Sequence, residues 1–397
     1  MSERPVRLGL VCHAGIGGSA RVAVELGSAL ADRGHMVHLV SRTPPLGAGS
    51  AHRGVSFHGW GASDGEPLSP RLDATWAAAD EESFLDLIES VSETMRLEVL
   101  HFHYAVPFAA LALRLRARMG PACPRLLMTL HGTDVSRFGF DRFLGPDLGA
   151  AVGGMDALTT VSRSHALLAQ GAFELARPPR VISNFVDLRR FRPRRLRSVS
   201  GPPRVIHVSN FRAVKQPEAL ARIFVGVRRQ ADARLTLVGD GERMAPARSI
   251  LVSSGVEGDV SYLGLRRDVH RILPFADILL VTSRTESFCL AALEAAACGL
   301  PVVAPRVGGL PEVVLDGTTG LLFEPGDEPG AVAAVLELLG DAQRRAAMGR
   351  AARAHARRFS HGRAVRQYES MYRELAAPRT GAGITRAPDR AVLAPTV

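Results

Sequence analysis

The sequence predicts an α/β protein built from two doubly wound domains that face each other across a cleft. Three observations support this prediction: a length of 397 residues, a hydrophobic share of 46%, and two successive series of short apolar runs alternating with helical patterns. At about 100–200 residues per domain, the length favours two or three domains, each with its own core. Alternation of strands and helices is typical of parallel sheets covered by helices.

The first half of the chain carries the strands of one parallel sheet. An apolar run at 6–12 and an amphipathic pattern at about 20–33 predict the first strand and helix. Residues 43–75, rich in Gly, Ser, Pro and Asp, are expected to form a long irregular excursion. Further strands are expected at 36–40, 97–101, 125–130 and 157–161, with helices near 107–118 and after the last strand.

A change of composition near residue 188 marks the boundary between the domains. We expect an N-terminal domain at 1–190, a linker at 191–203 and a C-terminal domain at 204–360. A helix at 361–377 is expected to pack back on the N-terminal domain, and 378–397 to be disordered. The strands of the second domain are expected at 204–208, 235–238, 260–263, 278–281, 302–304 and 320–323, with helical pattern at 329–377.

The cysteines and the apolar runs narrow the class of protein. The four cysteines lack CxxC spacing, which argues against a disulfide framework or a zinc site and for reduced thiols in a cytoplasmic protein. No run of about 18 apolar residues occurs, so no membrane span is expected. No apolar signal core follows residues 1–5, so export is not expected.

The basic residues contain one informative exception. The formal net charge is +10, from 49 Lys and Arg against 39 Asp and Glu, and Lys215 is the only lysine. Arg212 and Lys215 follow the strand at 204–208 and would share one face of a helical turn, where both charges could converge on a diphosphate. An ammonium is a compact charge that fits against a phosphate where a forked guanidinium does not. The alternative is a pair of surface cations.

Two glutamates follow the strand at 278–281 in a small, apolar stretch. Glu286 and Glu294 are separated by seven residues. A carboxylate in such surroundings is costly without hydrogen-bond donors, which sugar or ribose hydroxyls would supply. Salt bridges to neighbouring arginines are the alternative. Residues 303–312, which predict a strand, a glycine turn and a helix start, would form another wall of the same cleft.

A loop of small residues connects the first strand to the first helix. Gly15, Gly17, Gly18 and Ser19 would let backbone amides approach a phosphate at a helix N-terminus. The spacing also satisfies the loose dinucleotide fingerprint, but the acidic residue expected about twenty positions later is missing. Arg42 could instead meet a 2′-phosphate, so an NADP-dependent oxidoreductase is a second class of function.

Polar residues also follow two other strands of the first sheet. The segment at 101–104 reads His-Phe-His-Tyr, and the segment at 129–134 reads Thr-Leu-His-Gly-Thr-Asp. Because open α/β sheets bind ligands at the carboxyl ends of their strands, both segments are expected at the cleft.

A cluster of arginines before the second domain allows a third class of function, a nucleic-acid-binding protein. No aromatic platform or recognised nucleic-acid motif accompanies the cluster, so a solvated linker is expected instead. The cluster comprises Arg189, Arg190, Arg192, Arg194, Arg195 and Arg197.

Together these motifs resemble those of the family 4 retaining glycosyltransferases, which have the GT-B fold of two Rossmann-like domains. The resemblance covers roughly residues 6–375. Within the family the chain is most similar to the N-acetylglucosaminyl–malate synthases of bacillithiol synthesis, and next to the inositol-phosphate transferases of the mycothiol pathway. The motifs that carry the resemblance are Gly17-Gly18-Ser19, 131–134, 183–187, 210–215, Glu286-x7-Glu294 and Gly308-Gly309-x-Pro311-Glu312.

The resemblance implies a role for each matching residue. Arg212 and Lys215 would neutralise the departing nucleotide diphosphate, UDP or GDP, while Glu286 would contact the transferred sugar. These three residues are the expected catalytic residues together with His131, which would line the sugar site. Glu294 would hold the ribose hydroxyls. The rest of the donor site is expected to include Gly17, Gly18, Phe288, Cys289 and Leu290, and the acceptor site Ser19, Tyr104 and Thr129.

The resemblance also implies a mechanism without a metal, a cofactor or a protein nucleophile. Front-face substitution would retain the anomeric configuration, driven by electrostatic stabilisation of the leaving diphosphate beside a closely held acceptor. The expected partners are a nucleotide-sugar donor and a small-molecule acceptor, without nucleic acid or membrane. A homodimer is a further expectation.

Two positions depart from the family pattern. Cys289 stands where relatives usually have glycine in the Glu-x-Phe-Gly run. The arginine that the thiol-pathway relatives place twenty residues beyond the acceptor threonine falls on Gly149. An anionic acceptor would thereby lose a hydrogen bond worth about 1.5–3 kcal/mol, unless Arg137 or Arg142 replaces it. The acceptor stays open between L-malate, an inositol phosphate and a thiol such as ergothioneine, the last with a GDP-activated sugar as in the lincosamide pathway of antibiotic biosynthesis.

Overall fold

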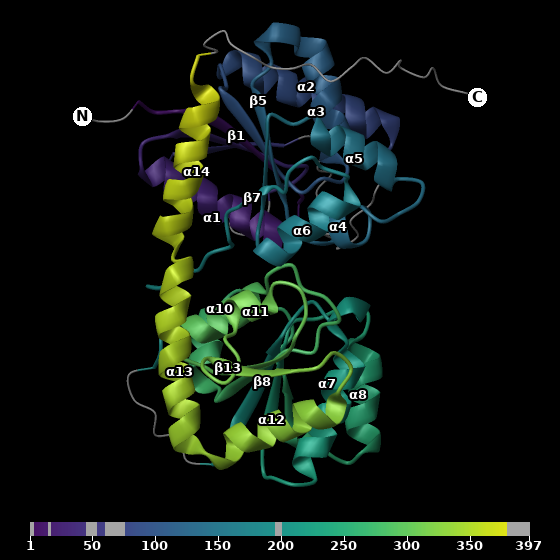
Figure 1. Ribbon diagram of the computed structural model, residues 1–397, viewed down its shortest axis with the longest axis vertical. Helices are drawn as coiled ribbons and strands as arrows, with labels where there is room; N and C mark the ends of the chain where they lie inside the picture. Colours follow the sequence, from purple (N-terminus) through teal and green to yellow (C-terminus); the bar gives the residue numbers. More distant parts are fainter. Residues whose placement is uncertain (1–3, 15–16, 45–53, 60–75, 195–200, 379–397) are drawn as a thin grey trace.

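The computed structural model describes residues 4–14, 17–44, 54–59, 76–194 and 201–378, which form two stacked lobes (Figure 1). Each lobe contains one parallel sheet with helices packed against it. This arrangement confirms the predicted fold class. The expectations for the tail at 379–397, for 195–200 of the linker, for Gly15 and for most of 43–75 lie outside the described residues.

The sheet of the first lobe has seven strands in the order β3-β2-β1-β4-β5-β6-β7. Strand β3 falls inside the expected irregular excursion and corrects that expectation. It is an edge strand with two of its four residues exposed, so it lacks the apolar run by which most other strands of the sheet were predicted. The two-residue edge strand at 180–181 was not predicted either. The strands are β1 (Arg7–Cys12), β2 (Met36–Val40), β3 (Val55–His58), β4 (Val99–His103), β5 (Arg125–Leu130), β6 (Ala157–Thr160) and β7 (Arg180–Val181).

Three helices of the first lobe were not predicted by the sequence analysis: α2 (Ala78–Thr94), α4 (Thr133–Ser136) and α5 (Gly145–Gly153). Helix α2 has a strongly acidic surface, and it packs on the core through Phe84, Leu85 and Ile88. The helices are α1 (Gly18–Asp32), α2 (Ala78–Thr94), α3 (Phe108–Met119), α4 (Thr133–Ser136), α5 (Gly145–Gly153) and α6 (Arg163–Ala172).

The second sheet has six strands in the order β10-β9-β8-β11-β12-β13. They are β8 (Arg204–Val208), β9 (Arg234–Val238), β10 (Val260–Tyr262), β11 (Ile278–Leu280), β12 (Val302–Pro305) and β13 (Gly320–Phe323). The helices of this lobe are α7 (Pro217–Arg228), α8 (Met244–Ser253), α9 (Val269–Ile272), α10 (Leu290–Ala297), α11 (Leu310–Val313) and α12 (Glu328–Gly340). A 3₁₀ turn, η2 (Ala213–Lys215), follows β8.

The last two helices run along both lobes (Figure 1). Helix α13 (Ala342–Ala356) packs on the second lobe, and α14 (His361–Ala376) packs on the first. On α14, Tyr368 and Tyr372 are buried in the first lobe, where the Tyr372 hydroxyl lies 2.7 Å from His101 Nδ1. The C-terminal helix therefore completes the core of the N-terminal half of the chain.

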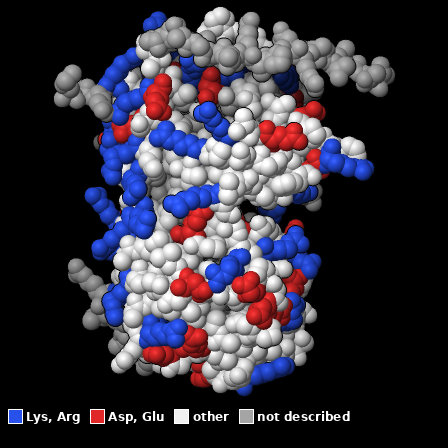
Figure 2. All heavy atoms as spheres, viewed as in Figure 1, with Lys and Arg blue, Asp and Glu red and all other residues white. Residues whose placement is uncertain are grey.

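Both sheets reverse their strand order at one point, between β1 and β4 in the first and between β8 and β11 in the second. Ligands of open α/β sheets bind beyond the carboxyl ends of the strands at such points. Figure 2 shows the surface hollowed between the two lobes on one side. Within the described part of the chain, no helix has the length and apolar character needed to span a membrane.

Candidate active site

An ion pair connects the segments that follow β8 and β11. These are the two strands at the switch point of the second sheet. Lys215 Nζ lies 2.6 Å from Glu286 Oε1, and Ser283 Oγ donates a hydrogen bond of 2.7 Å to the same oxygen. Burial is the largest influence and would lower the pKa of Lys215, but the opposing contributions, led by the charge of Glu286, together outweigh it and the pKa is raised. The only lysine of the chain is thus a charged group held at the cleft edge of its sheet.

The glycine turn after β12 shapes the loop that carries Glu286. A Cβ atom at Gly308, whose φ is +51°, would lie 1.9 Å from the carbonyl oxygen of Glu286. A Cβ at Gly309 would lie 2.2 Å from the carbonyl oxygen of Ser287, and Gly309 N donates to Glu286 O at 2.9 Å. The turn can therefore approach the Glu286 loop this closely only because both residues lack side chains.

Backbone with positive φ recurs in the segments that follow β4, β8 and β11. Among the described residues, six that are not glycine have positive φ, and four of them, Tyr104, Phe211, Gln216 and Cys289, lie in loops at the ends of strands or at the start of α10. Cys289 has φ +77°, which explains why a glycine suits this position. Burial, followed by the Glu286 charge, raises the pKa of the Cys289 thiol, so it stays protonated. Residues in rarely populated backbone regions tend to cluster at functional sites.

Glu294 forms the salt bridge that the sequence analysis held as the alternative to ribose binding. It lies on α10 with 3% of its surface exposed, and its carboxylate pairs with the guanidinium of Arg21 on α1 of the other lobe. Arg21 Nε also donates to Glu25 at 2.9 Å. Burial raises the pKa of Glu294, and the charge of Arg21 opposes the shift. A ribose hydroxyl would therefore share or replace an existing partner.

The N-terminus of α1 faces the start of α10 across the cleft. Gly17 and Gly18 are exposed, and a Cβ at Gly18 would lie 3.5 Å from Leu290 Cδ1. The first amides of a helix have no intrahelical acceptor, so those of α1 are available to an anionic group. Ser19 lies in the same turn and is half-buried.

The His131 loop after β5 is fixed by a buried carboxylate. Asp134 accepts hydrogen bonds from the amides of His131 at 3.0 Å and Gly132 at 2.6 Å. His131 Nε2 lies 3.1 Å from His103 Nδ1, and burial together with His103 lowers the pKa of His131 well below its usual value. The His131 ring is therefore neutral and held in one orientation.

The expected acceptor residues do not all reach the cleft. Thr129 is fully buried, with its hydroxyl 2.6 Å from both His101 Nε2 and Thr159 Oγ1. Its side chain projects from β5 toward α14, where Tyr368 also contacts it, so Thr129 belongs to the sheet interior and the expectation is corrected. Phe288 is also fully buried, so only its backbone can contact a donor.

Tyr104 directly follows β4, and the charge of a second-lobe residue, Arg212, acts on it. Its hydroxyl bonds that of Thr133, and its ring packs edge-on to His13. Burial and then the Asp134 carboxylate raise the pKa of Tyr104, while Arg212 from the second lobe opposes the shift. Arg212 is half-buried, and its charge acts on Tyr104 from the opposite lobe.

Sequence reasoning missed the residues that bridge the lobes. Ser287 Oγ donates to His131 O at 2.5 Å, and Ser162 Oγ donates to Ser287 O at 2.6 Å. Glu312, quoted above only as part of a motif, accepts from Ser164 N at 3.0 Å. Ser162 is the N-cap of α6, and a serine before a helical pattern was the one available signal.

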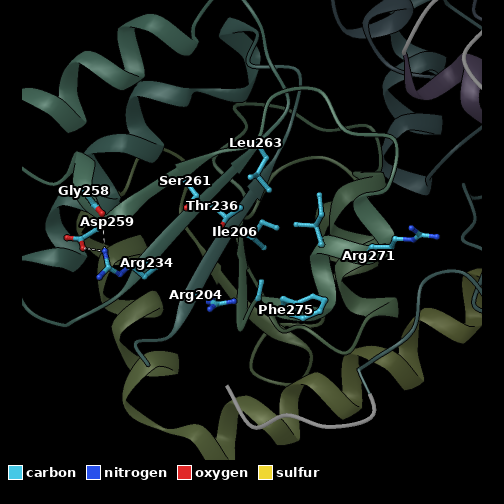
Figure 3. A pocket seen from close by; sticks show the side chains of 12 residues that line it. Arg204, Ile206, Arg234, Thr236, Gly258, Asp259, Ser261, Leu263, Arg271 and Phe275 are labelled. Atoms are coloured by element: carbon cyan, nitrogen blue, oxygen red, sulfur yellow. Dashed lines mark hydrogen bonds and ion pairs between the residues drawn. The ribbon is translucent and has the colours of Figure 1, made fainter. Parts of the chain in front are cut away.

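Two cavities lie in the second lobe. One of about 250 Å³ is beside the ion pair and is lined in part by Gln216, Thr282 and Ser283. Another of about 610 Å³ covers the face of β8, β9 and β10, and its lining includes Arg204 and Arg234 at the amino ends of their strands (Figure 3). None of the expected site residues lines the cavity of about 610 Å³, so this cavity is not the candidate active site. Among the described residues, no cluster of His, Cys, Asp and Glu is arranged to hold a metal ion.

Both halves of the chain match known families of glycosyltransferases. Residues 16–190 match the family described as Glycosyltransferase Family 4, and residues 202–341 match the one described as Glycosyl transferases group 1. The N-acetyl-alpha-D-glucosaminyl L-malate synthase of Bacillus anthracis is 32% identical over 382 residues, covering 93% of this chain and 97% of the relative. A D-inositol 3-phosphate glycosyltransferase of Saccharomonospora viridis is 35% identical over 224 residues, about half of each chain at 52%.

The fold has close counterparts among solved structures. Alr3699/HepE of Anabaena, crystallised in complex with UDP and glucose, superposes with a TM-score of 0.75 at 18% identity, over 93% of this chain and 99% of the other. The likeness shows that the two chains share the GT-B fold.

Proposed function

Since this chain belongs to the family 4 glycosyltransferases, we propose that it moves a glycosyl group from a nucleotide diphospho-sugar to a small polar acceptor with retention of anomeric configuration. The observation that carries the proposal is the Lys215–Glu286 ion pair at the switch point of the second sheet. The family assignment disfavours the NADP oxidoreductase, and Arg42, on which that alternative depended, lies 3.6 Å from Asp80.

Leaving-group stabilisation follows from the cations at the cleft. Lys215 and Arg212 would take the charge of the departing diphosphate, and the exposed amides at Gly17 and Gly18 would approach it from the other lobe. When the diphosphate becomes the partner of Lys215, the Glu286 carboxylate is free to accept hydrogen bonds from the transferred sugar. His131 would then border the sugar as a neutral group, with no protein nucleophile required.

The acceptor is the least constrained part of the proposal. The full-length relative named for L-malate supports an acceptor of that kind and a place in low-molecular-weight thiol biosynthesis. Gly149 supports a less anionic acceptor, because this residue of α5 offers no cation, and a Cβ atom there would already lie 3.4 Å from the backbone of Phe173. Arg137 and Arg142 are exposed and lie over the rings of the phenylalanines that follow them. A zwitterionic thiol is therefore the second candidate.

The proposal is tested by measuring release of UDP or GDP from a panel of sugar donors with L-malate, an inositol phosphate and ergothioneine as acceptors. We expect nucleotide release that depends on both substrates, and a product with the anomeric configuration of the donor. Activity with L-malate as high as with any other acceptor would contradict the interpretation of Gly149. A cytoplasmic location and a homodimer stay predictions.

A further inference from the structure

Ser287 is a residue of the Glu286 loop that is bound to the opposite lobe through both its side chain and its backbone. Its hydroxyl donates to His131 O at 2.5 Å, and its carbonyl accepts from Ser162 Oγ at 2.6 Å. His131 follows β5 and Ser162 lies just after β6, so one residue is attached to the ends of two neighbouring strands.

The surroundings of Ser287 leave little freedom of position. Gly309 packs against its carbonyl on one side, where a Cβ atom would lie 2.2 Å away. Gly132 lies on the other side, where a Cβ would be 3.4 Å from Ser287 Oγ. The residue is thus held between a glycine of each lobe, directly after Glu286 and against the carbonyl of His131.

A second carboxylate contact holds the same interface. Glu312 of the second lobe accepts hydrogen bonds from Arg163 N at 3.2 Å and Ser164 N at 3.0 Å, in the first turn of α6. A negative charge at a helix N-terminus is favourable because the first amides are otherwise unpaired. Glu312 therefore adds a contact between the lobes, while Ser287 is the residue of the Glu286 loop that bonds the carbonyl of His131.

We propose that Ser287 is a positioning residue for glycosyl transfer, which fixes the donor-side Glu286 loop against the acceptor-side His131 loop. The inference rests on the proposed function. Small displacements of reacting groups reduce the rate of a reaction even where binding is retained, because held geometry supplies much of the rate enhancement. The Ser287 hydroxyl bonds the opposite lobe rather than Lys215 or Glu286, so its loss should affect the chemical step more than donor binding.

The test compares Ser287→Ala with two further variants. In Ser287→Ala we expect kcat to fall about tenfold, the effect of one lost interior hydrogen bond, with donor KM and nucleotide diphosphate affinity within about twofold of wild type. Ser287→Thr should recover most of kcat, because threonine retains the hydroxyl that donates to His131 O. Ser92→Ala is the matched control, since it removes a buried hydrogen bond of 2.6 Å to Ile88 O in α2, and its kcat should be that of wild type.

The outcomes separate this inference from the proposed function. If wild-type protein transfers no glycosyl group to any acceptor of the panel, the proposed function is wrong, and this inference with it. If wild type is active and Ser287→Ala keeps its kcat, or loses activity only through donor KM, the inference alone is wrong. An equal fall of kcat in Ser92→Ala would likewise overturn it, because the effect would then be one of general stability.

Discussion

Lys215 Nζ and Glu286 Oε1 lie 2.6 Å apart at the cleft edge of the second sheet, so each neutralises the other before a donor binds. Under the proposed function, a diphosphate that enters the site would compete with Glu286 for Lys215. The carboxylate released by this exchange would become an acceptor for hydroxyl groups. One ion pair would therefore link the stabilisation of the leaving group to the recognition of the sugar.

Replacing Lys215 with alanine should reduce turnover by at least about 10²-fold, because it removes a preorganised charge from the leaving group. Circular dichroism should show an intact fold. Arg248→Ala is a suitable control, since Arg248 is an exposed cation paired with Glu257 in the same lobe, and it should leave kcat unchanged. A loss of less than tenfold in Lys215→Ala would contradict the assigned role.

Replacing Glu294 with alanine should chiefly weaken nucleotide binding, as measured by isothermal titration calorimetry. The matched variant is Arg21→Ala, which removes the partner that Glu294 has in this structure. If Glu294 binds ribose, Arg21→Ala should retain nucleotide affinity while Glu294→Ala loses it. Unchanged affinity in Glu294→Ala would remove this residue from the ribose site and leave it as an interlobe salt bridge.

Replacing Gly308 with alanine should destabilise the protein by at least about 2 kcal/mol, because the methyl group adds a backbone clash to an unfavourable positive φ. The clash is with the carbonyl oxygen of Glu286, 1.9 Å from the ideal Cβ position. Gly317 also has positive φ, +69°, but its Cβ would meet nothing within 4 Å. Gly317→Ala should therefore cost only about 1 kcal/mol. Urea unfolding of both variants tests the difference, and equal losses would contradict it.

Glu369 should make the stability of the protein depend on pH in the acidic range. Burial alone would raise its pKa, but hydrogen bonds from Arg33 and His35 outweigh burial and lower the pKa to about 2. An unfolded glutamate titrates near about 4.3, so the stabilisation is complete above that pH and is lost as pH falls toward the folded value.

The variant Glu369→Gln tests this dependence. It should lower the free energy of unfolding by about 2 kcal/mol at pH 7, since it removes charge-assisted hydrogen bonds. The difference from wild type should shrink as pH falls from about 5 to about 2. Urea unfolding measured at both ends of that range checks the sign, and a difference that stays constant would contradict the prediction.

Strands whose apolar runs are bounded by polar residues could be predicted to the residue. Strands β5, β8 and β13 have the bounds expected from the sequence. Helix α2 and strand β3 could not be found in this way, because most of their residues face solvent and only a narrow stripe packs on the core. The two-domain α/β class was predicted correctly from the alternation of strand and helix patterns. The glycosyltransferase activity was predicted correctly from the family resemblance that the motifs carry.

The candidate site could be predicted only as far as residue types and spacing allow. The sequence allows Lys215 and Glu286 to be expected on adjacent loops. Both residues follow strands that neighbour each other in a doubly wound sheet. It does not identify Arg21 as the partner of Glu294, since many arginines were available and the pairing depends on how the lobes meet. Thr129 was placed wrongly because the direction of its side chain is set by the packing of α14, far along the chain.

The position of α14 also determines when the first lobe can complete its core during synthesis. Tyr368 and Tyr372 fill the interior of the first lobe beside His101, yet they are translated only after the whole of the second lobe. The apolar residues of the first lobe that pack against these tyrosines therefore lack this contact until α14 has been synthesised. The half of the enzyme that leaves the ribosome first is the last to mature.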